Sequence, residues 1–153
     1  MVRLHPDIKC AEDLLGWDFE WLAGDADGHV GLFTTAGGGY MPERAWHDIE
    51  ALDAALEAVY RLPVSTTARF APEVAAGCLN TWREAAERGL FAFDSDVDGA
   101  PYSLVASPMT PVHISEFPAT AVRVLRQLQY RQLNFATVTT ISGDSLRHPD
   151  GDD

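Results

Sequence analysis

The clearest structural signal lies in residues 18–35, which read DFEWLAGDADGHVGLFTT. Phe19 and Trp21 belong to a first run rich in aromatic and branched side chains, and Val30 and Phe33 belong to a second. The tetrapeptide DADG separates the two runs, and an Asp-Gly turn between such runs is a strong hairpin signal. We therefore predict an antiparallel hairpin, with Gly28 in the positive-φ conformation that the turn requires.

Helical patterns follow in three places. Apolar residues from Trp46 to Val59 recur at spacings of three and four, which predicts an amphipathic helix from residue 43 to just before Pro63. A second helix is predicted over residues 72–88, because proline suits a first helical turn and Gly89 suits the position after the last one. A third is predicted over residues 118–129.

The remaining strand patterns complete the predicted fold. Residues 90–93 and 102–106 flank an Asp-rich turn, and residues 134–141 (NFATVTTI) indicate a closing strand. The predicted fold class is α+β in the order ββααββαβ, with a largely antiparallel sheet built from hairpins and three helices packed on one side. We expect one domain over residues 1–143 and a polar, disordered tail over residues 144–153.

Charge restricts the classes of partner. The chain of 153 residues carries 23 acids and 11 bases, a net charge of -12, and 12 of the acids lie within the first 57 residues. Such a field repels nucleic acids and anionic membranes, so we expect neither as a partner, and it attracts a basic protein. Residues 1–10 lack the apolar core of a signal peptide and no apolar run is long enough to cross a membrane, which predicts a cytoplasmic protein.

Metal and cofactor motifs are incomplete, and we predict no cofactor. Asp94, Asp96 and Asp98 begin an EF-hand pattern, but its twelfth position is Val105 in place of the bidentate glutamate. A weaker calcium loop stays open as an alternative to a solvated turn. His29 has no second ligand at a spacing typical of zinc sites, although a zinc site assembled by the fold also stays open. The glycine run at 37–39 lacks the lysine and hydroxyl of a phosphate loop.

Catalytic motifs are equally incomplete. The sequence contains no G-x-S-x-G elbow. Cys10 could form a catalytic pair with a histidine or a disulfide with Cys78. Cys78 is expected to lie on the inward face of a helix, pointing into the protein core. Glu20 and Asp25 could act as an acid–base pair if the fold brings them to a cleft.

The candidate partner-binding residues are the acids of the two Asp-rich turns and the tryptophans near the first turn. Carboxylates grip lysine and arginine side chains, and tryptophan is frequent among the residues that dominate binding energy. These candidates are Trp17, Glu20, Trp21, Asp25, Asp27, Asp94, Asp96 and Asp98.

The residues 18–23 and 25–37, DFEWLA and DADGHVGLFTTAG, resemble the opening of a group of small uncharacterised bacterial proteins. The size, the acidity and the α+β pattern also resemble immunity proteins of polymorphic and contact-dependent toxin systems. That resemblance implies a compact intracellular domain that binds one toxin domain and blocks it, and it implies no catalytic residue.

Three functional hypotheses follow. The first is an intracellular inhibitory binding module, most concretely an immunity protein that neutralises a basic toxin domain. The second is a small hydrolase-like enzyme whose site is assembled only by the fold. The third is a structural accessory protein that forms a homodimer through an exposed sheet edge.

Overall fold

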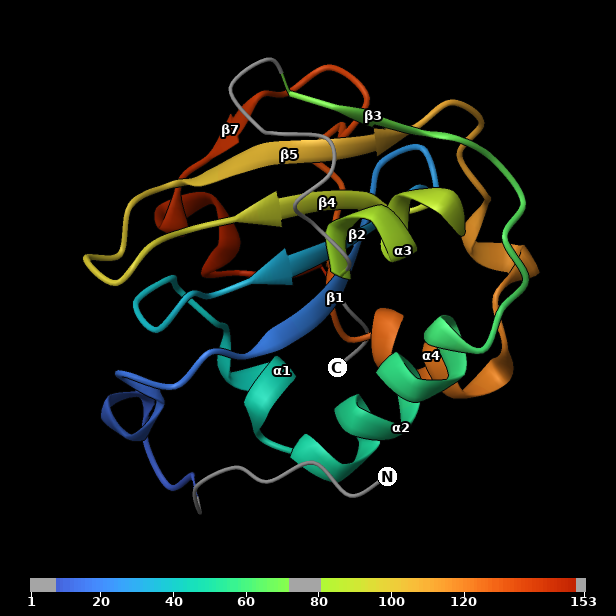
Figure 1. The fold of residues 1–153 in the computed structure, drawn as a ribbon. Helices are drawn as coiled ribbons and strands as arrows, with labels where there is room; N and C mark the ends of the chain where they lie inside the picture. Colours follow the sequence, from blue (N-terminus) through green and yellow to red (C-terminus); the bar gives the residue numbers. More distant parts are fainter. Residues whose placement is uncertain (1–7, 72–80, 151–153) are drawn as a thin grey trace.

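The computed structural model describes residues 8–71 and 81–150 of the chain (Figure 1). Within these residues the fold is α+β, with a mixed seven-stranded sheet and four α-helices. The strands are β1 (Glu20–Asp25), β2 (Val30–Thr34), β3 (Ala68–Phe70), β4 (Phe91–Asp94), β5 (Tyr102–Pro108), β6 (Gln129–Tyr130) and β7 (Thr140–Ile141). The α-helices are α1 (Glu43–Trp46), α2 (Ile49–Tyr60), α3 (Thr81–Glu87) and α4 (Ala119–Leu125), and the short 3-10 helices are η1 (Ala11–Leu14), η2 (Ile114–Glu116) and η3 (Gly143–Leu146).

Both predicted hairpins are present. Strand β1 pairs antiparallel with β2, so that Trp21 lies opposite Phe33 and Gly24 lies opposite Val30. Gly28 has a φ of 78°, as the turn requires. Strands β4 and β5 form the second hairpin.

The prediction of a largely antiparallel sheet is only partly correct. The strand order is β3-β5-β4-β2-β1-β6, with β7 paired to β5 outside this path. The pairs β2–β4 and β1–β6 are parallel. Parallel neighbours need a long crossover connection, and the chain between β2 and β4 supplies one that contains α1, α2, β3 and α3.

The predicted helices are shorter than expected. The first is divided into α1 and α2, because Asp48 leaves the helical conformation and its carboxylate accepts the N–H of Ala51 at 3.1 Å as an N-cap. The second appears as α3, and its predicted start at residues 72–80, with Cys78, lies outside the described residues. The third ends at Leu125, since Gln129 and Tyr130 pair with β1. No helix in the described ranges combines the length and the apolar character needed to cross a membrane.

The predicted closing strand over residues 134–141 is wrong except for its last two residues. Asn134 reverses the chain, because its side-chain oxygen accepts the N–H of Ala136 and its carbonyl accepts the N–H of Thr137, each at 3.1 Å. The segment then crosses the sheet with Phe135 fully buried, and only β7 pairs with β5.

One face of the sheet carries a cluster of rings that we call the aromatic core. Trp21 stacks on Phe33 with 4.5 Å between centroids, and Phe33 stacks on Phe93 at 5.0 Å. Phe135 meets Phe33 edge-on at 5.9 Å from the crossing segment. The aromatic core consists of Trp21, Phe33, Phe93, Tyr102 and Phe135.

Helices cover the opposite face, where Leu22, Leu32 and Ala92 lie side by side across three strands. Helix α3 contacts β4 and β5, while α2 and α4 contact each other and β1. In Figure 1, α3 lies in front of the strands and the red C-terminal segment lies behind them. Every residue of β2 is buried, because both faces of this strand are covered.

The residues expected to form a tail belong to the folded body as far as residue 150. Leu146 is fully buried at the end of η3, and the hydroxyl of Tyr130 donates to its carbonyl at 2.9 Å. Residues 144–150 are thus packed against β6, in contrast to the disordered tail that their polar composition indicated.

Replacing Phe135 by alanine tests the role of the crossing segment. Phe135→Ala removes ring contacts to Phe33, Phe91 and Phe93, and we expect it to lower the free energy of unfolding by about 3–5 kcal/mol. Urea denaturation followed by tryptophan fluorescence measures the change. Thr139→Ala, at an exposed position of the same segment, is the control and should change stability by less than about 0.5 kcal/mol. Equal effects of the two variants would contradict the packing described here.

Candidate functional site

The two Asp-rich turns have the same local structure. They read DADGH at residues 25–29 and DVDGA at residues 96–100. In each, one oxygen of the first aspartate accepts the backbone N–H groups two and four residues later, at 2.9–3.1 Å. The glycines have φ values of 78° and 79°. The motif therefore specifies one turn, used twice.

The two turns lie at opposite ends of the sheet. The first precedes β2 and the second follows β4, and these two strands run parallel to each other. The acids predicted to bind a partner therefore fall into two separate groups, and a single partner surface cannot be built from all of them.

The first turn is integrated into the core. The side chain of Asp25 is 0% exposed, and its second oxygen accepts the N–H of Phe135 at 2.8 Å. Trp21 is fully buried in the aromatic core, and its indole N–H donates to the hydroxyl of Tyr102. Trp21 and Asp25 were predicted to contact a partner, but the structure places both side chains in the interior, where neither reaches the surface.

A depression of about 240 Å³ lies at the other end of the sheet. It is formed where β1 begins, where β2 and β4 end and where α3 begins, so it brings together Glu20 and Asp94 from the predicted set. We call it the acidic pocket; its lining residues are Asp18, Glu20, Thr34, Ala36, Thr81, Trp82 and Asp94. None of these lining residues is basic.

Hydrogen bonds hold the acidic pocket in shape. The Thr34 hydroxyl donates to the Asp94 carboxylate at 2.6 Å, and the indole N–H of Trp82 donates to the Thr34 oxygen at 3.1 Å. Glu20 accepts from the Tyr60 hydroxyl at 3.1 Å. Asp94 is thus fixed in a half-buried position by a chain of contacts that reaches α3.

Charge accumulates around Asp94. Burial raises the pKa of the Asp94 carboxyl above its ordinary value of 3.8, and the nearby negative charge of Asp18 raises it further, against the opposing hydrogen bond from Thr34. The ionised carboxylate is therefore less stable here than in water. A cation placed in the pocket would relieve this cost.

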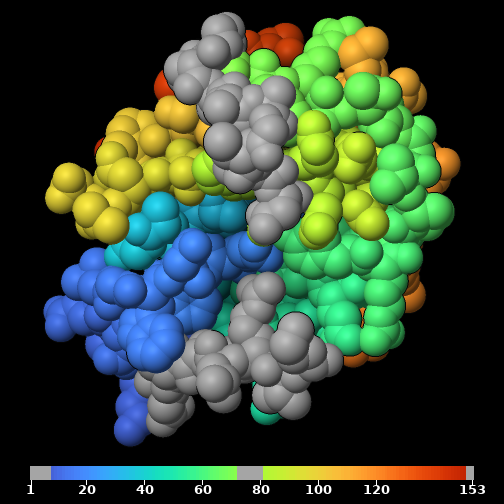
Figure 2. All heavy atoms as spheres, in the orientation of Figure 1, coloured from blue at the N-terminus to red at the C-terminus, as the bar shows by residue number. Residues whose placement is uncertain are grey.

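Exposed apolar side chains lie in the loops that adjoin the lining residues Asp18, Ala36 and Asp94 of the acidic pocket. Leu15 is 65% exposed, Trp17 is 47% exposed and Val97 is 74% exposed, and we call these three residues the apolar rim. Gly37 links the loops that carry them: its carbonyl accepts the N–H of Gly16 at 2.8 Å, and a side chain added at Gly37 would meet that of Val97 at 3.7 Å. Figures 1 and 2 show the blue segment before β1, the loop after β2 and the β4–β5 turn gathered along one edge of the molecule.

Several residues of this site were missed by sequence reasoning. Asp18 was missed although it stands two residues before the predicted Glu20, a spacing that places both on one face of an extended segment and was a usable signal. Glu20 lies opposite Thr34, and Thr34 lies opposite Asp94, so the polar row crosses three strands. The pairing of Thr34 with Asp94 belongs to the parallel pair β2–β4, which no local sequence pattern predicts.

The other predicted candidates are not brought together as expected. Glu20 and Asp25 stand at the two ends of β1, so they cannot act as an acid–base pair. Cys10 is an exposed free thiol, whereas Cys78 lies outside the described residues. Asp96 and Asp98 are exposed in the turn that carries Val97.

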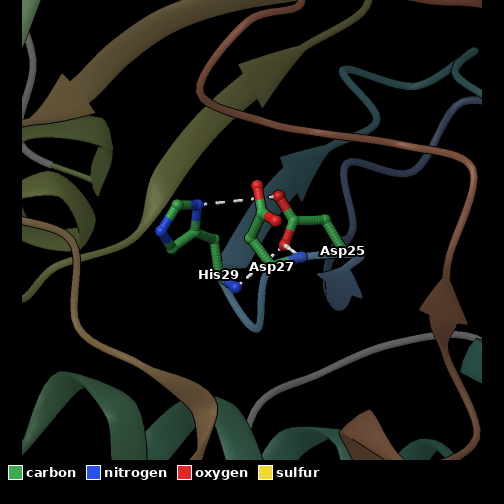
Figure 3. A group of neighbouring side chains, drawn as sticks. All are labelled: Asp25, Asp27 and His29. Carbon is green, nitrogen blue, oxygen red and sulfur yellow. Dashed lines mark hydrogen bonds and ion pairs between the residues drawn. The ribbon is translucent and has the colours of Figure 1, made fainter.

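Metal-ligating side chains converge at the first turn. Asp25, Asp27 and His29 each offer one ligand atom, and these atoms all lie within 4.8 Å of one another (Figure 3). In the described ranges Asp94, Asp96 and Asp98 do not form such a group.

Comparisons of the chain with models of protein families, with curated proteins and with solved structures gave no match.

The shared turn geometry allows a matched pair of substitutions. Asp25→Asn places an amide N–H against the N–H of Phe135, whereas Asp96→Asn keeps the one oxygen that the second turn uses. We expect Asp25→Asn to lower the free energy of unfolding by about 1–3 kcal/mol and Asp96→Asn to change it by less than about 0.5 kcal/mol. Chemical denaturation of both variants measures the difference. Comparable losses would show that the second oxygen of Asp25 carries no structural role.

The raised pKa of Asp94 gives a pH dependence with a defined sign. A carboxyl group whose pKa is higher in the folded than in the unfolded chain lowers the free energy of unfolding as the pH rises from the unfolded to the folded pKa. Above the folded pKa this loss of stability is complete. The difference in melting temperature between Asp94→Asn and the wild type should therefore shift in favour of the variant as pH rises from below 3.8 to 7. Asp98→Asn, an exposed position nearby, is the control. A difference for Asp94→Asn that is independent of pH would contradict the assignment.

Proposed function

We propose that the protein is an intracellular binding module that receives a basic protein partner at the acidic pocket and the apolar rim. Most concretely, it is an immunity protein that neutralises a basic toxin domain. The observation that carries the proposal is the placement of Asp18, Glu20 and Asp94 in one depression, with three exposed apolar side chains in the adjoining loops. The net charge of -12 agrees with it.

The acidic pocket suits a lysine or arginine side chain. Its volume of about 240 Å³ lies below the roughly 300–1,000 Å³ of ordinary small-molecule sites, which favours one inserted side chain over a larger ligand. Hydrogen bonds between a cation and carboxylates are short and strong. Because Asp94 is half-buried, its interaction with a cation is weakened less by water than that of a surface carboxylate.

The apolar rim supplies the contacts that electrostatics alone does not. Interfaces combine a desolvated apolar centre with a polar border, and tryptophan is frequent where binding energy concentrates. Trp17 directly precedes Asp18 in the chain, and Val97 stands between the exposed Asp96 and Asp98. A basic partner would therefore meet apolar anchors and carboxylates on one surface.

Inhibition would follow from the charge of the partner. Toxins that act on nucleic acids present basic surfaces to phosphate groups. A protein that covers such a surface with carboxylates competes directly with the nucleic acid. The long-range field would also accelerate the encounter, in a manner that salt suppresses.

An enzyme remains the second candidate, because one observation favours it. Asp94 has a raised pKa and lies near the carboxylate of Asp18 in a depression, as acid–base residues of active sites often do. Hydrolytic activity lost in Asp94→Asn and Asp18→Asn, without any protein partner, would support this alternative. A homodimer has less support, since the strands at the two ends of the sheet order, β3 and β6, contain only three and two residues.

The test is binding to the product of the adjacent gene, measured by calorimetry at low and high salt. We expect binding at low salt and affinity that falls steeply as salt increases. Trp17→Ala and Asp18→Asn should each weaken binding about tenfold or more. Glu50→Gln makes the same change of charge at an exposed position of α2 and should have a much smaller effect. Absence of binding, or binding indifferent to salt and to Asp18→Asn, would overturn the proposal.

A further inference from the structure

The group at the first turn has no role in the binding surface described above. Asp25, Asp27 and His29 lie at the end of the sheet opposite to the acidic pocket. Figure 3 shows the imidazole and the two carboxylates directed toward a common space. We propose that Asp25, Asp27 and His29 together bind one divalent transition-metal ion of the zinc class.

The strongest observation is an unsatisfied atom. His29 Nδ1 is buried and makes no hydrogen bond with the described part of the chain. Buried side-chain nitrogen atoms nearly always have a hydrogen-bond partner or a metal ion, so a buried nitrogen without one indicates a missing ligand. His29 Nδ1 faces Asp25 Oδ2 at 3.7 Å, which is too long for a hydrogen bond.

The same separation suits two ligands of one metal ion. Zinc binds imidazole nitrogen at about 2.0–2.1 Å and carboxylate oxygen at about 2.0–2.2 Å, so tetrahedral coordination places such ligand atoms roughly 3.4 Å apart. The distance of 3.7 Å from His29 Nδ1 to Asp25 Oδ2 differs from this value by a small rotation of the imidazole. The geometry therefore lies closer to that of a shared ion than to that of a direct contact.

Both carboxylates keep capacity for a metal ion. Asp25 Oδ2 accepts one hydrogen bond, from Phe135, and a carboxylate oxygen has two lone pairs. Asp27 is exposed, and the amide of Asn134 donates to its Oδ2 at 2.7 Å. Asp25 is thus a fixed ligand, and Asp27, which Asn134 holds through Oδ2, still has a carboxylate oxygen to offer the ion.

The donor set selects the class of metal. Calcium and magnesium take oxygen ligands, whereas imidazole combined with carboxylates suits zinc and its first-row neighbours. Three protein ligands leave a further coordination position for water. The second turn shows what the histidine adds, because it has the same backbone but Ala100 in place of His29 and does not belong to such a group among the described residues.

The competing explanation is a proton. A protonated His29 would form an ion pair with Asp25 after a small movement of the ring, and no metal would be needed. The two explanations differ in what zinc does to the protein. Zinc binding at the turn would shift the imidazole resonances of His29, whereas a simple ion pair would respond to pH alone.

The experiment uses the full chain without a histidine tag, treated with a chelator and titrated with zinc chloride by calorimetry. We expect one equivalent to bind, and we expect His29→Gln and Asp27→Asn each to weaken binding about tenfold or more. His113→Asn is the matched control, because His113 stands beside Gly28 but its Nδ1 accepts the N–H of Ser115. Asp98→Asn is the control at the second turn. Both controls should bind zinc as the wild type does.

A second measurement keeps the result independent of variant folding. Nuclear magnetic resonance of the wild-type imidazoles should show a zinc-dependent shift confined to His29. The proposal is overturned if zinc does not bind, if His29→Gln binds it undiminished, if calcium alone binds, or if the His29 signal responds only to pH.

Discussion

The packing of Phe33 determines how the rest of the molecule is arranged. Its ring contacts Trp21, Phe93, Tyr102 and Phe135, so β1, β4, β5 and the crossing segment are all held by one side chain of β2. Because β2 is buried over its whole length, hardly any polar side chain can be placed along it. Polar groups are therefore displaced to the two ends of the sheet, and both candidate sites are found there.

The two ends use polar groups differently. At the first turn, Asp25 satisfies three backbone N–H groups and ties the hairpin to the segment that covers the aromatic core. At the other end, the Thr34 hydroxyl donates to Asp94 and orients its carboxylate, and carboxylates line the depression there. The first arrangement stabilises the fold, whereas the second keeps a half-buried carboxylate whose desolvation cost a cation in the pocket would offset.

Local chemistry explains what the sequence alone could predict. Both D-x-D-G turns and the hairpins that they close were visible, since aspartate and glycine determine their geometry within five residues. The parallel pairing of β2 with β4 was not visible, because it depends on a crossover of more than fifty residues. The polar row Glu20–Thr34–Asp94 and the acidic pocket depend on that pairing. The predicted strand over residues 134–141 was mostly wrong, because the β-branched composition suits a strand whereas Asn134 turns the chain.

The apolar rim has an evolutionary consequence. Leu15, Trp17 and Val97 are exposed, and the turn that carries Val97 keeps its shape through hydrogen bonds made by Asp96 and Ser95 and the positive φ of Gly99. Substitutions at these three positions would leave folding almost untouched. If the rim contacts a partner, lineages could change the partner that they recognise by substitutions at the rim, one residue at a time, while the same scaffold is inherited unchanged.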